Sequence, residues 1–247
     1  YSSEDLYTWE YHGNFFETNY KKYPYLGEHW ELPLLLPVAT PDGSVKKDLF
    51  LITPHGKGGN VEVYYWLGEF DHENIRFIPD HEEPKLIDFG GSVFTGPSGF
   101  VDPKTGRTIL FTIAQGRDRS SWEDYYSGWA HSAGMPISLS LDETTHELRL
   151  EPIQEIENAR EKTLIDVKNL SLEEVNSKLK GVVGDLLEIN LELKNVDATE
   201  YGIKVRKHPK DVEYTKITYK QHPKELVLDR TVSSMDKTAV SYTHLRA

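Results

Sequence analysis

The sequence of 247 residues contains no cysteine, which excludes disulfide bonds and thiolate metal sites. Basic residues are scarce as well: 28 lysines and arginines stand against 40 aspartates and glutamates, so the formal net charge is -12. A broad surface for nucleic acid or for anionic membranes is therefore not expected. Long hydrophobic runs are also missing, since no stretch approaches the roughly 18 apolar residues of a membrane-spanning helix, and no membrane insertion is expected.

Aromatic residues, in contrast, make up 11% of the chain, with 14 tyrosines and 5 tryptophans. Sugar-binding sites use such rings as stacking platforms, but β-rich folds are also enriched in them, so this composition leaves both interpretations open. The hydrophobic share of 38% and the charged share of 28% are typical of a globular protein with one large or two medium domains.

Short β-strands separated by polar turns are predicted between residues 47 and 150. The candidate strands are "DLFLIT", "VEVYYWLGEF", "NIRFIP", "TILFTIA", "ISLSL" and "HELRLEP". The turns "DPKTG" and "DETTH" separate the later ones. Strands at roughly 8–12-residue spacing with polar turns are typical of a sandwich, a barrel or a propeller.

A second region begins after residues 152–162. There, "SLEEVNSKL" predicts one helix, with Ser171 and Glu174 forming a capping box. Four strands with cleaner apolar-polar alternation follow: "LLEINLELK", "YGIKVRKH", "EYTKITYK" and "KELVLDRT". Alternation indicates sheets with one wet face. The sequence thus predicts an all-β protein of two domains joined near residues 152–162.

Glu31 heads the apolar run of "HWELPLLLPV", directly after Trp30. Burying an unpaired carboxylate costs several kcal/mol, so Glu31 is either a solvated strand-end residue or a carboxyl with a function. Residues 25–82 and 85–150 follow parallel plans, each about the size of a propeller blade of roughly 40–50 residues. Because the first strand of a blade lines the central channel, Glu31 is predicted to point into the funnel of a propeller.

Six segments occur in an order that resembles glycoside hydrolase family 32, which contains the β-fructofuranosidases: invertases, inulinases and levanases. They are "YSSEDLYTWEYHG", "HWELPLLLPV", "IDFGGSVFTGPSGFVDPKTGRTILF", "GWAHSAGMPISLSL", "LRLEPIQEIENAR" and "YGIKVRKHPKDVEYTKITYKQHPKELVLDRT". The resemblance runs from Tyr1 to about Ser233 and implies a five-bladed β-propeller followed by a β-sandwich. This agrees with the strand pattern.

The resemblance also implies a division of the chain. Residues 1–155 correspond to the end of blade three and to blades four and five of the catalytic propeller, and residues 156–239 to the sandwich. Residues 240–247, "VSYTHLRA", are expected to be either a non-native tail without packing contacts or an ordinary frayed terminus. Because the chain opens at Tyr1 without a methionine, we expect a fragment with missing upstream residues, and localisation, bacterial cytoplasm or secreted, stays open.

Three acidic residues act in this family: a nucleophilic Asp in an Asn-Asp-Pro-Asn-type motif, a transition-state-stabilising Asp in an Arg-Asp-Pro motif, and an acid/base Glu in a Trp-Glu-Cys-Pro-type motif. Only the last motif maps onto this chain, at residues 30–33, and it implies that Glu31 is the catalytic acid/base. The other two are expected upstream of Tyr1; "VDP" at 101–103 instead indicates a hairpin turn. Leu32 replaces the usual Cys, which is expected to cost little beyond tuning. Leu34 replaces a frequent Asp and removes a possible polar contact near the sugar, which leaves the substrate preference open.

The candidate substrate-binding residues are Trp30, Asp88, Ser92, Thr95 and Trp129. Asp88 matches the first Asp of a fifth-blade segment of the family, and Ser92 stands where a second Asp is usual. Ser92 or Thr95 could bond a fructose hydroxyl, although the glycines of this segment are equally compatible with a bulge. In the polar-aromatic loop over 116–131, Trp122, Tyr125 or Trp129 could stack on a sugar ring, or a local ion pair of Arg117 and Asp118 could leave the loop merely structural.

We therefore expect a fragment of a retaining glycoside hydrolase that cleaves β-fructofuranosidic bonds in sucrose or fructans. The alternative is a non-catalytic carbohydrate-binding propeller-sandwich protein or pseudoenzyme. A fructosyltransferase would be a variant of the hydrolase hypothesis that differs in the acceptor. The ten histidines do not occur at the sequence spacings that are typical of metal ligands, and no metal or cofactor is expected. Oligomeric state is not determined by the sequence.

Overall fold

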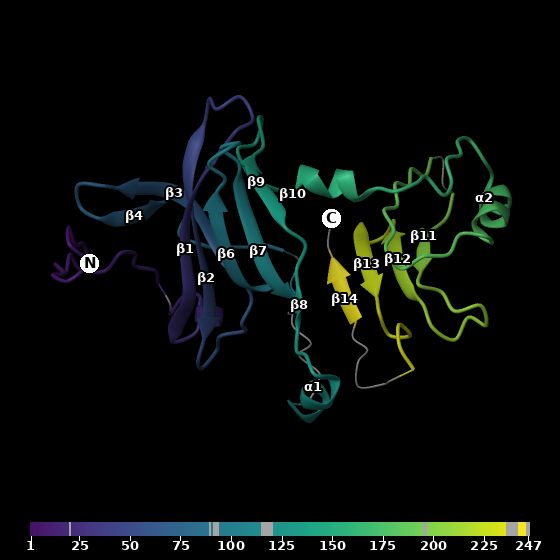
Figure 1. Cartoon of the computed structure of the whole chain (residues 1–247), viewed down its shortest axis with the longest axis horizontal. Helices are drawn as coiled ribbons and strands as arrows, with labels where there is room; N and C mark the ends of the chain where they lie inside the picture. The colour runs from purple at the N-terminus through teal and green to yellow at the C-terminus, as the bar shows by residue number, and fades with distance from the viewer. Residues whose placement is uncertain are drawn as a thin grey trace. The chain divides into compact units, whose positions relative to one another are not determined.

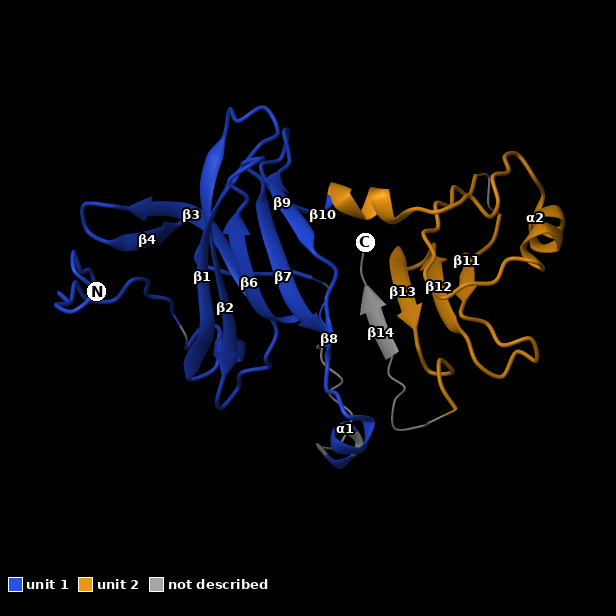
Figure 2. Ribbon diagram, viewed as in Figure 1, with its two compact units in different colours: residues 1–153 blue, residues 154–247 orange. Residues whose placement is uncertain are grey.

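The computed structural model describes residues 1–19, 21–88, 90, 94–114, 121–194, 197–235 and 242–245 (Figure 1). The chain divides into two compact units, residues 1–153 and residues 154–247 (Figure 2). The sheets of both units are antiparallel, and the structure is mostly β, as predicted. Within the described residues, no helix is long and apolar enough to cross a membrane.

The first sheet of unit 1 is an antiparallel meander in the order β1-β2-β3-β4, with the short β5 paired to β3. The short 3-10 helix η1 precedes it. The bounds of these elements are η1 Pro24–Leu26, β1 His29–Ala39, β2 Lys46–His55, β3 Tyr64–Asp71, β4 Arg76–Pro79 and β5 Lys85–Leu86. The predicted strands of this part of the chain are confirmed.

The second sheet of unit 1 has the order β6-β7-β9-β10, with β8 paired to β7. The helix α1 lies between β7 and β8 along the chain (Figure 1). The bounds are β6 Thr95–Val101, β7 Thr108–Ala114, α1 Ser121–Ser127, β8 Ser132–Ala133, β9 Ile137–Leu141 and β10 Leu148–Pro152. The two sheets of unit 1 thus share the plan of an antiparallel meander.

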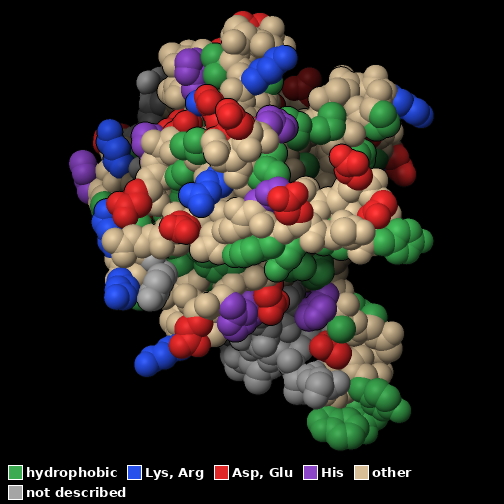
Figure 3. All heavy atoms as spheres, turned by 90° about the vertical axis from the view of Figure 1, so that its left-hand side faces the viewer, with side chains coloured by type: hydrophobic (Ala, Val, Ile, Leu, Met, Phe, Trp, Pro, Cys, Tyr) green, Lys and Arg blue, Asp and Glu red, His purple; other side chains and the backbone are tan. Residues whose placement is uncertain are grey.

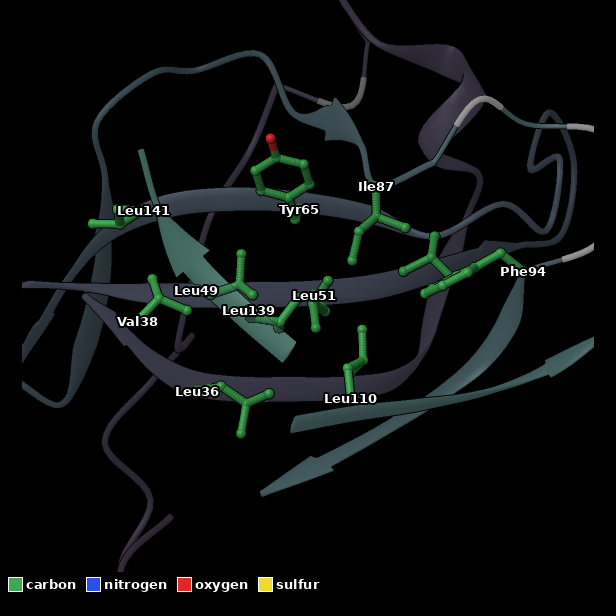
Figure 4. Packing of buried hydrophobic residues seen from close by; sticks show 11 residues of the cluster. Leu36, Val38, Leu49, Leu51, Tyr65, Ile87, Phe94, Leu110, Leu139 and Leu141 are labelled. Carbon is green, nitrogen blue, oxygen red and sulfur yellow. The ribbon is translucent and has the colours of Figure 1, made fainter. Parts of the chain in front are cut away.

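A hydrophobic core joins the two sheets (Figure 4). Leu36 and Val38 of β1 enter it with the alternation that a strand imposes, because successive side chains point to opposite faces. Leu110 of β7 and Leu139 of β9 meet them from the second sheet. Each such buried side chain contributes about 1.5–3 kcal/mol, so this core holds the sheets as one unit.

The opposite face of the first sheet carries an aromatic cluster that the N-terminal segment covers. Phe50 and Trp66 of the sheet pack against Phe16 at ring-centroid distances of 5.7 and 4.8 Å. Tyr23, directly before η1, and Leu26, at its end, are buried against the same cluster. Because both of its faces are covered, the middle of β2 reads as an almost continuous hydrophobic run.

Unit 2 contains a sheet of four antiparallel strands in the order β11-β12-β13-β14. The helix α2 begins after Ser171, whose side chain forms the predicted capping box with Glu174. The bounds are η2 Gln154–Ala159, α2 Leu172–Leu179, β11 Glu200–Val205, β12 Thr215–Lys220, β13 Glu225–Asp229 and β14 Tyr242–Leu245.

One expectation for unit 2 differs from the structure. The predicted strand "LLEINLELK" is wrong: residues 186–194 form no strand, because they pair with no neighbouring strand of the described chain. In the C-terminal segment, Tyr242–Leu245 pairs with β13. Alternating hydrophobic residues favour a strand only when a partner supplies its hydrogen bonds, and this is decided by tertiary structure.

Candidate functional site

Glu31 lies near the start of β1 and is paired with Thr53 at the end of β2. Its side chain is 52% exposed, so solvent and a ligand can both reach the carboxylate. Oε2 of Glu31 lies 3.3 Å from Nε2 of His55, whose ring is more buried. The sequence identified Glu31 but not His55, although a histidine between the end of an apolar strand and the glycine-rich turn "GKGG" was a usable signal.

A β-bulge directly follows Glu31 on β1. The pairing register of β1 and β2 shifts between Glu31 and Leu34, and Leu32 has a φ of 53°. Pro33 fits such an interruption because it has no N–H to give to the ladder. Bulges are frequent next to active sites, where they re-aim a side chain. The local sequence Glu-Leu-Pro therefore accounts for the geometry around the carboxylate.

Trp30 anchors the start of β1 on the other side of the strand. Its indole Nε1 donates a hydrogen bond of 2.9 Å to the carbonyl oxygen of Leu26, and its ring packs 5.5 Å from that of Trp66. Since successive residues of a strand point to opposite faces, this ring lies on the opposite face from the Glu31 carboxylate. The structure thus does not bring these two predicted site residues together on one surface.

The turn that follows His55 is held by neighbours of Glu31. The backbone N–H of Glu28 donates to the carbonyl oxygen of His55 at 2.9 Å, and Oε2 of Glu28 accepts from the backbone N–H of Lys57 at 3.3 Å. The ring of His29 stacks on that of His55 with centroids 6.0 Å apart. These contacts fix the position from which His55 reaches Glu31.

Among the described residues, no group of three or more His, Asp or Glu side chains is placed to hold a metal ion.

Asp88 follows β5 and is half-buried. Its Oδ1 accepts a hydrogen bond of 2.9 Å from the backbone N–H of Gly90. Burial raises the pKa of Asp88. The nearby hydroxyl of Tyr64 also has a raised pKa, chiefly through burial, with the charges of Glu62 and Asp88 adding to it. Tyr64 was not singled out from the sequence, because only the tertiary fold brings it within range of the charges of Glu62 and Asp88.

The remaining predicted binding residues differ in accessibility. Thr95 begins β6 but is only 2% exposed, so its hydroxyl is not presented at the surface. Trp129 follows α1 and is largely exposed. Ser92 lies outside the described residues.

The site residues converge on one end of unit 1. Glu31 stands at the start of β1, Asp88 follows β5, and Tyr64, paired with Ile52, starts β3. In the core, Phe94 lies beside Ile87, at the end away from Val38 and Leu141 (Figure 4). Phe94 directly precedes β6. The first residue of β6, Thr95, pairs with Ile113 near the end of β7, and α1 follows β7 along the chain. Strand direction therefore brings Glu31, Asp88 and the segment of Trp129 to the same end of the stacked sheets.

Two family models match this chain. The glycosyl hydrolases family 32 N-terminal domain matches residues 1–152, and the glycosyl hydrolases family 32 C terminal domain matches residues 155–246.

Curated relatives are similar over part of their own length. The levanase of Bacillus subtilis is 26% identical over 247 residues, which cover 96% of this chain and 35% of the levanase. An insoluble β-fructofuranosidase isoenzyme of Arabidopsis thaliana is 31% identical over 143 residues, 53% of this chain and 24% of that protein. The chain thus spans well under half the length of these relatives.

Solved structures share the fold. The family 32 β-fructofuranosidase of Bombyx mori has a TM-score of 0.67 at 17% identity, covering 99% of this chain and 47% of that one. The fructan 1-exohydrolase IIa of Cichorium intybus has a TM-score of 0.58 at 16% identity, covering 87% of this chain and 48% of that one. The fold of these neighbours, a propeller followed by a sandwich, accounts for the two β units. With both family models matched in order along its length, the chain belongs to glycosyl hydrolase family 32.

Proposed function

We propose that this chain supplies the acid/base residue, Glu31, of a hydrolase that cleaves β-fructofuranosidic bonds in sucrose or fructans. The observation that carries the proposal is the half-exposed carboxylate of Glu31 at a bulge on β1, within the family's Trp-Glu-x-Pro motif. Relatives named as a levanase and as fructan 1-exohydrolases support the substrate class, as do family structures in complex with sucrose and with 1-kestose.

In this proposal Glu31 protonates the oxygen of the leaving group and then removes a proton from the attacking water. A retaining mechanism also needs an anionic carboxylate about 5–5.5 Å away, which attacks the anomeric carbon. We propose that the part of the family fold that this chain does not span supplies that nucleophile and the third, stabilising carboxylate. His55 holds the Glu31 carboxylate in one orientation, which favours transfer of the proton to a defined position.

We further propose the finer assignment of the fold. The first sheet is blade four and the second sheet is blade five of a five-bladed propeller, residues 1–155 include the end of blade three, and residues 156–239 form the sandwich. The similar plan of the two stacked meanders supports this assignment. Residues 240–247 are proposed to be a non-native tail, even though part of it pairs with β13.

Asp88 and Trp129 are the proposed substrate-binding residues. Asp88 lies at the same end of unit 1 as Glu31, and a half-buried carboxyl can bond a sugar hydroxyl. Trp129 presents an exposed ring. The packing of Trp30 and the burial of Thr95 support structural roles for these two residues, which shape the site from behind.

The test is fructose release by a protein that joins this chain to the rest of the family fold. We expect release from sucrose, levan or inulin, and its loss on Glu31→Gln. The 247-residue chain alone is expected to release no fructose, because general acid catalysis by itself contributes only about 10²–10⁴-fold. Binding of these sugars by the joined protein without any release would favour the alternative, a non-catalytic carbohydrate-binding protein.

A further inference from the structure

Thr53 carries a buried hydroxyl whose hydrogen-bonding capacity is unused in the described part of the chain. The residue lies near the end of β2 and is only 1% exposed, and its Oγ1 makes no hydrogen bond there. Buried polar side chains are normally hydrogen-bonded, and a buried hydroxyl without a partner lowers stability. Valine would fill the same volume without this cost, so the hydroxyl at this position requires a reason.

The Thr53 hydroxyl is enclosed by unit 1 itself. Charged side chains on the face of the molecule in Figure 3 stand in solvent, where water satisfies them. Thr53 instead lies on the same face of β2 as Leu51, two residues earlier, which enters the core between the two sheets (Figure 4). A ligand in solvent therefore cannot reach Oγ1 directly, and its partner must be a side chain that already lies beside it.

Glu31 is the carboxylate that strand pairing places beside Thr53. The two residues are direct cross-strand partners, so their side chains share one face of the sheet and their Cβ atoms lie about 4.5–5.5 Å apart. Rotation about the side-chain bonds of Glu31 brings a carboxylate oxygen within hydrogen-bond distance of a hydroxyl at that spacing. In the structure the carboxylate points to its diagonal neighbour instead, with Oε2 3.3 Å from Nε2 of His55. Glu31 thus has two partners within reach on β2, and one of them is in use.

We propose that Thr53 is a second positioning residue for Glu31, whose hydroxyl donates a hydrogen bond to the carboxylate after proton transfer. His55 holds the carboxyl before this step. When the proton of Glu31 passes to the oxygen of the leaving group, the negative charge stays on the carboxylate, and Thr53 keeps its own proton while sharing it in the hydrogen bond. A donor that the fold has already placed stabilises such a charge without reorganisation of solvent. The catalytic role rests on the proposed function, whereas the contact rests on strand pairing and burial alone.

A comparison of melting temperatures tests the contact without catalysis. In the 247-residue chain, Thr53→Val removes the unsatisfied hydroxyl, so the melting temperature of unit 1 should rise by about 2–4 °C. His55→Phe removes the present partner of Glu31, so the carboxylate should turn to Thr53. Adding Thr53→Val to this variant should therefore give no rise. Tryptophan fluorescence reports on unit 1, which contains all five tryptophans.

Thr95→Val is the matched control for this comparison. Thr95 is 2% exposed, and its Oγ1 likewise makes no hydrogen bond within the described residues, but its cross-strand partner is Ile113 rather than a carboxylate. Its substitution should raise the melting temperature equally with His55 or Phe at position 55. If Thr53→Val also gives the same rise in both backgrounds, Glu31 does not reach Thr53 and the proposal is wrong.

Steady-state kinetics of the joined protein tests the catalytic role. Thr53→Val should lower kcat for sucrose by about 10-fold with KM little changed, because a hydrogen bond to a charged group is lost. Thr53→Ser keeps the hydroxyl and should retain most of the rate. In the Glu31→Gln background, Thr53→Val should cause no further loss, since no charge forms on the glutamine.

The outcomes of these kinetics separate this role from the proposed function. An unchanged kcat in Thr53→Val, or an equal loss with Glu or Gln at position 31, would overturn the catalytic role of Thr53 while leaving Glu31 as the acid/base residue. An undiminished kcat in Glu31→Gln itself would overturn the proposed function and, with it, the catalytic role. The melting temperatures would still decide whether the contact between Thr53 and Glu31 forms.

Discussion

Nε2 of His55 lies 3.3 Å from Oε2 of Glu31, across the first antiparallel strand pair of unit 1. The two residues are not direct partners: Glu31 pairs with Thr53, and His55 pairs with His29. The contact is therefore diagonal, at a separation that long side chains can span. It joins the proposed acid/base residue to a ring that stacking and a tight turn hold in place.

Glu31→Gln keeps the shape of the side chain and removes the transferable proton. In the joined protein, turnover of sucrose should fall by roughly 10²–10⁴-fold. An activated aryl fructoside should lose far less in its first step, because its leaving group departs without protonation. Initial rates on both substrates measure the difference.

Glu28→Gln is the matched control for that substitution. A glutamine oxygen can still accept the hydrogen bond from the backbone N–H of Lys57, so turnover should stay near that of the unaltered protein. Equal losses on sucrose and on the aryl fructoside in Glu31→Gln would mean that Glu31 shapes the site without donating a proton.

His55→Phe keeps a ring against His29 and removes the nitrogen that faces Glu31. Because a misplaced catalytic group loses rate without losing substrate affinity, kcat should fall by up to about 10²-fold with KM little changed. His55→Gln, which places an amide N–H within reach of the carboxylate, should restore part of the loss. Steady-state kinetics checks both variants, and an unchanged kcat in His55→Phe would remove the orienting role.

Asp88→Asn should change how the stability of unit 1 depends on pH. Burial raises the pKa of Asp88, so its contribution to stability is fully present below the unfolded value of about 3.9 and is lost as pH rises through the raised folded value. The variant cannot ionise and should escape this loss. Urea unfolding from about pH 3 to about pH 7 is followed by tryptophan fluorescence, because all five tryptophans lie in unit 1.

Asp42→Asn provides a control of opposite sign. Acceptance of hydrogen bonds from Thr40 and Ser44 lowers the pKa of Asp42 to about 2. Its contribution is present above the unfolded value of about 3.9 and is lost as pH falls toward the folded value. The difference in the free energy of unfolding between the unaltered chain and Asp42→Asn should therefore shrink as the pH falls. The same trend in both variants would contradict the burial argument for Asp88.

Leu51→Ala tests the core that joins the two sheets. Leu51 is fully buried within it, so truncation should lower the free energy of unfolding of unit 1 by about 2–5 kcal/mol. Ile78→Ala removes a largely exposed side chain of β4 and should change it by no more than about 0.5 kcal/mol. Urea unfolding monitored by tryptophan fluorescence compares the two, and similar effects would show that this core does not limit the stability of unit 1.

The strand pattern of unit 1 and the capping box of α2 follow from local sequence. Alternation places Leu36 and Val38 on one face of a strand, and a serine three residues before a glutamate satisfies the helix N-terminus. These features depend on neighbours in the chain, which the sequence displays directly. Glu31 could be singled out as a candidate functional residue for the same reason, since the sequence places its carboxylate beside an apolar run.

Other properties depended on partners distant in the chain. His55 contacts Glu31, and Tyr64 comes within range of the charge of Asp88, only because strand pairing and register bring them together. The same dependence explains the error over residues 186–194, whose alternation finds no partner strand within the described part of the chain, and the packing of Trp30 away from the site. The sequence by itself determined which segments could be strands and which carboxyl could act. The tertiary structure decided what each of them faces, because burial and long-range pairing are properties of the folded chain.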